Sequence, residues 1–454
     1  MQRGQTENSG ARLKIAVVGA GISGLSAAWL LAKRNEVAVY EADSRIGGHS
    51  HTVDVEAGGR RIAVDTGFIV YNEPCYPNLT ALFAELGVAT AATDMSFAVS
   101  LDRGRLEYAG KDLAGLIAQP SNLLRPRFWS MVAELLRFYQ LAPRDLPTLG
   151  EETLAAYLDR RRFGRAFRED HLYPMAAAIW STPAAEVGAY PAAAFIRFCD
   201  NHGLLKLIGR PVWRTVVGGS REYVRRLSAP FADRIVKGAP VTKIFRDATG
   251  VEIVDARGER RRFDHVVVAT HADQALNLIA TPTHDERRLL GAFRYARNEA
   301  VLHGDAGLMP KRRAAWAAWN YLSDADGPDR RLSVTYWMNQ LQPLGAEPEL
   351  FVTLNPLREP RPETVHGTYA YEHPLFDAAT ARAQRELWSL QGKQNTWFCG
   401  AHFGAGFHED GLQAGLAVAE DLGGLARPWV VANDSARIHR PGPAAMSVYR
   451  EAAE

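Results

Sequence analysis

Residues 13–31 read LKIAVVGAGISGLSAAWLL, and this stretch decides the fold. Its first six residues are nearly all apolar, which is typical of a buried parallel strand, and its last seven have the pattern of an apolar helix. Between them, Gly19, Gly21 and Gly24 follow the G-x-G-x-x-G pattern. The first glycine permits a tight turn, the second lets a pyrophosphate approach the backbone, and the third lets the helix pack close to the strand. The stretch therefore predicts a dinucleotide site at the helix N-terminus, where free N–H groups and the helix dipole favour anions.

A second strand at residues 37–40 is followed by Glu41, seventeen residues after Gly24. A carboxylate at this place accepts hydrogen bonds from both ribose hydroxyls of an adenosine and repels a 2′-phosphate, so NADP is disfavoured. Residues 242–262 have the pattern of a short antiparallel meander, and residues 263–270 return as a buried strand. An inserted meander is expected in FAD enzymes and not in simple NAD dehydrogenases, so the order of elements favours FAD.

The composition fits an ordinary globular protein. The chain has 454 residues, of which 47% are hydrophobic and 23% charged, so it is long enough for two or three domains and is not wholly disordered. A net charge of +2 gives no general field that would attract nucleic acid, and no nucleic-acid partner is expected. The three widely spaced cysteines contain no C-x-x-C pair, which argues against a zinc site or a disulfide framework. We therefore expect no metal site.

One uncharged run, residues 15–32, has the length of a signal anchor. Its regularly spaced glycines and the Lys33-Arg34 pair that ends it fit a strand, turn and helix better. We therefore expect a cytoplasmic protein whose membrane contact, if any, is peripheral, at the inner membrane.

Four stretches of the chain resemble the flavin-containing amine oxidase and phytoene desaturase superfamily. They are VVGAGISGLSAAWLL (17–31), EADSRIGGHSHT (41–52), VVGGSREYVRRL (216–227) with the strand VTKIFRD (241–247), and FCGAHFGAGFHEDGLQAGLAVAEDL (398–422). The second stretch departs from the family pattern at His49, where arginine is usual. The resemblance implies an α/β fold, with a glutathione-reductase-type, Rossmann-like FAD-binding domain, an interleaved α+β substrate domain and non-covalent FAD.

The resemblance also implies which residues contact the cofactor. Val241 would meet the adenine through its backbone, and Gly411 with the helix start that follows would lie near the pyrophosphate and the ribityl chain. Asp65-Thr66-Gly67 resembles the family's D-x-G loop, which approaches the flavin ring. The full predicted set is Gly19, Gly21, Ser23, Gly24, Glu41, Ala42, Arg45, Gly48, His49, Val241, Gly400, Asp410, Gly411 and Gly415.

Three shorter stretches carry a finer resemblance. WNYL (319–322), YEHPLFD (371–377) and GFHEDGL (406–412) resemble a bacterial flavoprotein group related to the flavin domain found ahead of plant cyclopropane fatty acid synthases. Within that group, the flavin desaturases of furan fatty acid synthesis are the nearest in function. The resemblance implies that a fatty acyl chain, methyl-branched and phospholipid-bound, is desaturated by hydride transfer to flavin N5. A membrane surface and a lipid methyltransferase are the partners this would imply.

Flavin dehydrogenation needs a C–H bond held over N5 and a base or water path for the second hydrogen. Amine oxidases of the superfamily usually place a lysine near N5, but this chain has no lysine between Lys243 and Lys311. Of the two aromatic positions that flank the substrate amine in those enzymes, one falls on His408 and the other near Tyr369 or Tyr371. The predicted catalytic residues are His408, Glu409 and His303, with Glu299, Asp305 and His402 as further candidates. For each of them a structural hydrogen bond is the competing interpretation.

Two alternative functions stay open. An amine or polyamine oxidase would share the fold, although the missing lysine counts against it. The chain could instead bind FAD without turnover, as an accessory subunit of a lipid methyltransferase, and no lipid would then reduce its flavin.

The positions of the motifs predict the domain organisation. Residues 1–84, 201–284 and 386–425 are assigned to the FAD-binding domain, residues 85–200 and 285–385 to the substrate domain, and residues 426–454 to a surface tail.

Two features of the substrate half have competing interpretations. Apolar residues recur at helical spacing over 128–142, which predicts a helix that faces the core, an acyl tunnel or a bilayer. Arg160, Arg161, Arg162, Arg165 and Arg168 form a basic cluster, either a solvated helix face or a docking patch for phospholipid.

Overall fold

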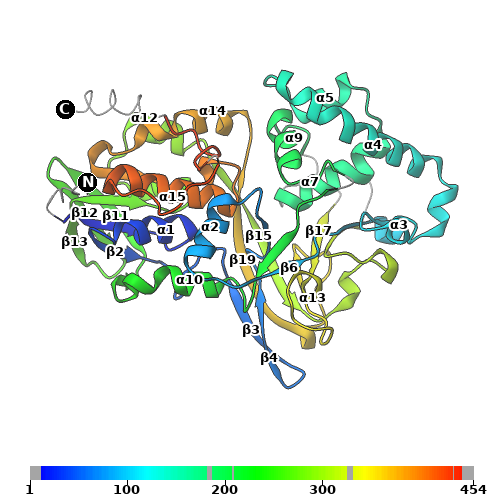
Figure 1. The fold of residues 1–454 in the computed structure, drawn as a ribbon, viewed down its shortest axis with the longest axis horizontal. Helices are drawn as coiled ribbons and strands as arrows, with labels where there is room; N and C mark the ends of the chain where they lie inside the picture. The colour runs from blue at the N-terminus through cyan, green and yellow to red at the C-terminus, as the bar shows by residue number, and fades with distance from the viewer. Residues whose placement is uncertain (1–11, 181–186, 207–208, 325–330, 433, 442–454) are drawn as a thin grey trace, which may run out of the picture. The chain divides into compact units, whose positions relative to one another are not determined.

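The strand that precedes the glycine turn is the central strand of a five-stranded parallel sheet. β1 (Lys14–Val18) pairs with β2 (Glu36–Tyr40) on one side and with β14 (His265–Val268) on the other. β10 (Ile235–Val236) and β20 (Thr396–Phe398) complete the order β10-β2-β1-β14-β20. Helix α1 (Ile22–Leu31) follows β1, and helix α15 (His408–Gly423) packs against it (Figure 1). The predicted α/β dinucleotide fold is confirmed.

The predicted meander is also present. β11 (Val241–Asp247), β12 (Gly250–Asp255) and β13 (Arg260–Phe263) form an antiparallel three-stranded sheet directly before β14. The helices near this sheet in sequence are α10 (Arg221–Ser228), α11 (Ala272–Leu278) and α12 (His284–Leu290), and α14 (Ala378–Glu386) follows much later in the chain.

The computed structural model describes residues 12–180, 187–206, 209–324, 331–432 and 434–441. The chain divides into two units, the first made of Met1–Gly48, Val224–Ala292 and Ala383–Glu454, the second of His49–Tyr223 and Phe293–Arg382. Residues 49–84 and 201–223, which the motif positions assign to the FAD-binding domain, thus belong to the second unit. The reason is strand pairing, because the partners of β3, β5 and β9, which these segments carry, all lie in the second unit.

The second unit is built on a mixed seven-stranded sheet in the order β19-β15-β18-β17-β16-β7-β8. Its strands are β7 (Phe97–Leu101), β8 (Leu106–Ala109), β15 (Arg294–His303), β16 (Trp319–Ser323), β17 (Leu332–Trp337), β18 (Phe351–Leu354) and β19 (Val365–Leu375). Two smaller sheets are the hairpin of β3 (Thr52–Ala57) with β4 (Arg60–Asp65), and the trio β5 (Tyr71–Asn72), β9 (Trp213–Val216) and β6 (Thr90–Thr93). Its helices are α2 (Pro77–Glu85), α3 (Leu113–Leu116), α4 (Pro126–Asp145), α5 (Leu154–Arg160), α6 (Arg165–Phe167), α7 (Tyr173–Trp180), α9 (Ala192–Asn201) and α13 (Met338–Leu341).

The predicted helix over residues 128–142 is α4. It buries Phe128, Met131 and Phe138, which confirms that one face serves the core. None of the described helices is long and apolar enough to cross a bilayer.

The arginine cluster at the end of α5 is largely neutralised. Arg160 pairs with Glu152, Arg161 with Asp145, Arg165 with Glu169, and Arg168 with Asp159. The cluster therefore does not present a bare positive surface.

The tail after α15 is held by ion pairs within the first unit. Arg427 pairs with Glu420, and Arg440 with Glu420 and Asp421. Arg437 reaches Asp410 in the first turn of α15, with 3.4 Å between Nη1 and Oδ1. The described part of the tail therefore lies along α15.

Candidate functional site

Two glycines of the G-x-G-x-x-G turn are required by the fold itself. Gly19 has φ +103°, and a Cβ there would lie 2.8 Å from the Ala269 carbonyl oxygen. A Cβ on Gly24 would overlap the Gly19 carbonyl oxygen. Both glycines therefore let β1, α1 and the end of β14 meet without side chains between them.

Gly21 is different, because nothing in the fold requires a glycine there. Its φ of −76° and ψ of −176° are extended values that any residue adopts, and nothing lies within 4 Å of where its Cβ would stand. The open space lies at the N-cap of α1, where backbone N–H groups are available to an anion. A glycine without a packing reason at this point fits a turn that a pyrophosphate approaches closely.

Two helices begin beside this space. A Cβ on Gly411 would lie 2.7 Å from Ser23 Oγ and 3.1 Å from Ile22 Cγ2, and a Cβ on Gly415 would overlap the Ser23 carbonyl oxygen. The first turns of α1 and α15 are therefore in direct contact, and the glycines of α15 allow it. Since each helix N-terminus carries a partial positive charge, two such ends together favour a doubly charged anion more than one does.

Glu41 follows β2, and each of its two carboxylate oxygens accepts one backbone hydrogen bond. Oε2 accepts a hydrogen bond from the Ala20 N–H at 2.7 Å, and Oε1 accepts one from the Asp43 N–H at 2.9 Å. Because a carboxylate oxygen has two lone pairs, both retain acceptor capacity for a pair of hydroxyls. The chain that leads to Val241 runs alongside, since the Glu41 N–H donates to Val236 O and the Ala239 N–H to Glu41 O. The residues predicted to bind the adenosine are thus brought together in one unit.

The remaining predicted cofactor residues of the first unit surround this turn. A Cβ on Gly48 would lie 3.1 Å from Gly21 Cα, and Arg45 Nη1 donates to Gly48 O at 2.8 Å, with Ala42 in the same loop. Gly400 follows β20. Asp410 Oδ2 accepts from the Phe407 N–H at 2.8 Å, and burial raises the pKa of this carboxyl.

The second unit contains a hydrogen-bonded group of its own, formed by His51, Thr66 and Tyr371. The Tyr371 hydroxyl lies 2.9 Å from His51 Nδ1 and 2.6 Å from Thr66 Oγ1. The Thr66 hydroxyl also lies 3.2 Å from the His51 carbonyl oxygen. We call His51, Thr66 and Tyr371 the Tyr–His–Thr network. It can accept a proton at one atom and pass it to another, because every member both donates and accepts.

Aromatic rings and a rigid loop surround the network. The ring of Tyr369 meets that of His51 edge to face, and the ring of His49, the remaining predicted cofactor residue, lies 5.3 Å from that of Tyr371 and 5.4 Å from that of His373. The Phe68 N–H donates to the His49 carbonyl oxygen at 2.7 Å. Sequence reasoning did not single out His51. A signal existed only for its partners, because Tyr369, Tyr371 and His373 alternate along β19 and so share one face.

Asp65 holds the D-x-G loop in place. It is fully buried, and its carboxylate accepts hydrogen bonds from Thr52 Oγ1, from the N–H and hydroxyl of Ser220, and from Gln342 Nε2. Burial raises the pKa of Asp65 to about 6, although these donors stabilise its charged form. The residue therefore serves to fix Thr66 beside Tyr371.

The three predicted catalytic residues have different surroundings. His303 at the end of β15 is fully buried, with Nε2 2.7 Å from Thr353 Oγ1 and Nδ1 accepting from the Asp305 N–H. Burial lowers its pKa to about 4, and with both nitrogens engaged the geometry fits the structural interpretation instead of the catalytic one. His408 begins α15, and burial lowers its pKa to about 3, so its ring is neutral near pH 7. Glu409 is fully buried, and Gln413 Nε2 donates to its Oε1 at 3.0 Å.

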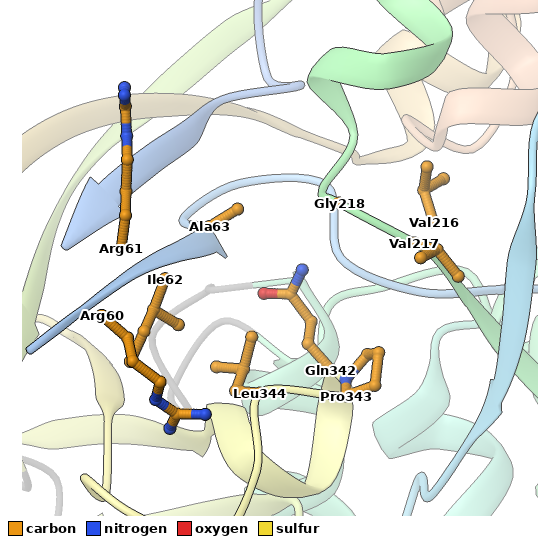
Figure 2. Close-up of a pocket in the computed structure, with 10 residues that line it drawn as sticks. All are labelled: Arg60, Arg61, Ile62, Ala63, Val216, Val217, Gly218, Gln342, Pro343 and Leu344. Carbon is orange, nitrogen blue, oxygen red and sulfur yellow. The ribbon is translucent and has the colours of Figure 1, made fainter. Parts of the chain in front are cut away.

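A pocket of about 260 Å³ lies in the second unit, lined by residues of β4, of the end of β9 and the segment after it, and of the turn around Gln342 (Figure 2). Ile62, Val216 and Leu344 line it with apolar groups, and Arg60 and Arg61 add two cations. Gln342 lines the same pocket and donates to Asp65 Oδ2, so the pocket wall is bonded directly to the D-x-G loop.

Solved structures share this fold. A putrescine oxidase superposes with a TM-score of 0.64 at 15% identity, over 90% of this chain and 99% of that one. Cyclohexylamine oxidase from Brevibacterium oxydans gives a TM-score of 0.61 at 17% identity, over 90% and 99% of the two chains. A fatty acid isomerase from P. acnes that produces CLA gives 0.63 at 16% identity, over 90% and 97%. At these identities the likeness concerns the fold alone.

Two comparisons rest on sequence. A carotenoid phi-ring synthase of Chlorobaculum tepidum is 37% identical over 78 residues, which is 17% of this chain and only 12% of that protein. Residues 22–301, more than half of the chain, match the family described as flavin containing amine oxidoreductase. Together with the glycine turn, the meander and the paired helix ends, this match shows that the chain belongs to the flavin containing amine oxidoreductase family.

Proposed function

We propose that the chain is an FAD-dependent oxidoreductase that desaturates a fatty acyl chain, and that it holds FAD without a covalent link. The observation that carries the flavin part is the open space at Gly21 between two helix N-termini, since the protein's own packing gives no reason for it. Glu41 and the backbone at Val241 would hold the adenosine, and the starts of α1 and α15 would hold the pyrophosphate. Bound FAD supplies a two-electron acceptor for a hydride taken from a C–H bond.

Desaturation removes two hydrogens from neighbouring carbons, one as a hydride and one as a proton, and leaves a double bond. The proton needs an acceptor within hydrogen-bond reach. In the proposal the Tyr371 hydroxyl takes it while passing its own proton to His51 Nδ1, which lies 2.9 Å away. Thr66 Oγ1 lies 2.6 Å from the phenolic oxygen and donates to the His51 carbonyl oxygen, so it positions the Tyr371 hydroxyl for this transfer. His408 and Glu409 remain proposals for contact with the cofactor ring, since a pKa of about 3 makes His408 a weak base at neutral pH.

Four points favour an acyl chain over an amine. The finer resemblance at residues 319–322, 371–377 and 406–412 implies a lipid substrate. The segment between Lys243 and Lys311 has no lysine. The pocket beside Asp65 is lined by apolar groups and two arginines, which would repel a polyamine. Among the similar proteins, two are named for a fatty acid and a carotenoid, both long apolar molecules.

Polyamine oxidation is the second candidate, because putrescine oxidase shares the fold over nearly its whole length. The two candidates separate in one assay. The flavin-loaded protein is incubated with an electron acceptor and either a phospholipid carrying a saturated, methyl-branched acyl chain or putrescine. The proposal predicts an acyl product lighter by two hydrogens in mass spectrometry and no aldehyde from putrescine. Aldehyde without any acyl product would refute it.

The accessory hypothesis makes a different prediction. A subunit that only supports a lipid methyltransferase would bind FAD and yet give neither product. It would also form a stable complex with the methyltransferase, which size-exclusion chromatography of the mixed proteins measures.

A further inference from the structure

An exposed apolar strip runs along helix α4 and the turn before it. Leu124 is 87% exposed, Trp129 46%, Leu123 42% and Leu136 40%. Trp129, Ala133 and Leu136 are spaced by four and three residues, so they share the helix face opposite the buried Phe128, Met131 and Phe138. We call Leu123, Leu124, Trp129, Ala133 and Leu136 the α4 strip. The core of the second unit makes no use of it.

The strip is held as one surface. Trp129 Nε1 donates to the Leu123 carbonyl oxygen at 2.9 Å, which ties the helix to the preceding turn. The indole ring also meets the buried ring of Phe128 edge to face. Because its N–H is satisfied inside the protein, the exposed part of Trp129 is apolar. An exposed, fixed tryptophan beside leucines is a pattern found at membrane interfaces.

Cations border the strip. Residues 103–144 contain seven basic side chains, Arg103, Arg105, Lys111, Arg125, Arg127, Arg137 and Arg144, against three acidic ones. Each of the three acids has a partner within the protein, although Asp112 is itself exposed. Glu107 is fully buried in an ion pair with Arg312, Asp112 caps α3, and Glu134 accepts from the Gly164 N–H. Arg105 and Arg127 are ion-paired with Asp102, Glu169 and Asp170, so they add little positive charge. The cations that flank the strip at helical spacing are Arg125, Arg137 and Arg144, and they give its border a positive charge.

The size of the strip favours lipid over a protein partner. A stable protein interface uses on the order of 20 residues a side, and the strip offers five apolar side chains that project from one helix and a turn. A bilayer surface requires only a few inserted apolar groups together with cations that meet anionic headgroups. The positive border gives the strip charge complementarity with such headgroups.

We propose that the α4 strip docks the protein on an anionic lipid bilayer, with Leu123, Leu124 and Trp129 inserted and the neighbouring arginines on the headgroups (Figure 1 shows α4). The cluster Arg160–Arg168, which the sequence offered as a docking patch, is not part of it, because four of its five arginines are paired with carboxylates. The proposal goes beyond the proposed function, since docking does not depend on which substrate is oxidised.

The test is sedimentation of the full, flavin-loaded chain with vesicles of phosphatidylcholine alone or mixed with phosphatidylglycerol. We compare the wild type with Leu124→Glu and Leu136→Glu, and with Val430→Glu as the matched control, since Val430 is 99% exposed and lies in the first unit. Because all three side chains are exposed, we expect the substitutions to leave the melting temperature unchanged, and thermal unfolding of each variant checks this. We expect wild type and Val430→Glu to bind the anionic vesicles, more weakly as salt rises, and Leu124→Glu to lose about tenfold in affinity.

The proposal is overturned if the wild type binds neither kind of vesicle, or if Leu124→Glu and Val430→Glu bind equally. A concentration-dependent dimer of the wild type that Leu124→Glu abolishes, without any vesicle binding, would assign the strip to self-association instead. No readout here depends on oxidation, so failure of this test leaves the proposed function standing.

Discussion

Replacing Gly21 with alanine tests whether this glycine is needed for packing of the protein or for close approach of the cofactor's pyrophosphate. The added Cβ meets no protein atom within 4 Å, and the φ of −76° suits alanine. The N-cap position disfavours alanine by about 0.5–1 kcal/mol relative to glycine, and the stiffer unfolded chain returns about 0.4–1 kcal/mol. The free energy of unfolding is therefore expected to change by less than about 0.5 kcal/mol.

The same methyl group would stand where the pyrophosphate approaches the turn. Inserting one methyl into a filled site costs about 1–3 kcal/mol, which raises a dissociation constant roughly 5- to 150-fold. The assay is fluorescence titration of the apoprotein with FAD, beside urea unfolding of the same preparations. Gly24→Ala is the control, because its Cβ would overlap the Gly19 carbonyl oxygen and should destabilise the fold as well.

An unchanged dissociation constant for Gly21→Ala would refute the reasoning, since the open space would then not be the cofactor's. A loss of stability equal to that of Gly24→Ala would refute it too, because Gly21 would then have a packing role.

Three further predictions concern single residues. Tyr371→Phe should bind FAD normally and slow anaerobic flavin reduction by substrate about 100-fold or more. Tyr369→Phe, which keeps its ring beside His51, should change this rate little. Equal reduction rates in the two variants would remove the Tyr–His–Thr network from the mechanism. Glu41→Gln loses one acceptor oxygen and the charge, and should raise the FAD dissociation constant about tenfold; equilibrium dialysis measures this, and an unchanged value would contradict the adenosine assignment. Burial lowers the pKa of His303 to about 4, so unfolding takes up a proton below the ordinary value of 6.5, and stability is lost as the pH falls from 6.5 towards 4. In His303→Gln the fall in the free energy of unfolding between pH 6.5 and pH 4 should therefore be smaller by up to about 3 kcal/mol, as measured by urea unfolding. An equally steep fall in both proteins would contradict this assignment of the pH dependence to His303.

The parts of the fold that sequence predicts are those fixed by local physics. The apolar run of β1, the glycine turn and the apolar α1 are contiguous, so the period and the turn residues determine them directly. The meander at residues 241–263 is also local, because each strand pairs with the next one along the chain.

The parts that sequence does not predict depend on distant pairing or on burial. The hairpin of β3 and β4 follows the glycine motif at once, yet its Asp65 is bonded to Ser220 and Gln342, which are 155 and 277 residues away along the chain. The Tyr–His–Thr network joins residue 371 to residues 51 and 66, a separation that no local pattern encodes. For His303 the sequence gives the residue type but not the burial, which changes a candidate base into a structural hydrogen-bonding group.

The most direct test of the central claim is the visible spectrum of the flavin-loaded protein during anaerobic titration with bacterial phospholipid. The account predicts an oxidised flavin band that bleaches in wild type and bleaches far more slowly in Tyr371→Phe, with FAD that is released on denaturation. A band that stays unbleached by phospholipid but bleaches with putrescine would contradict the account.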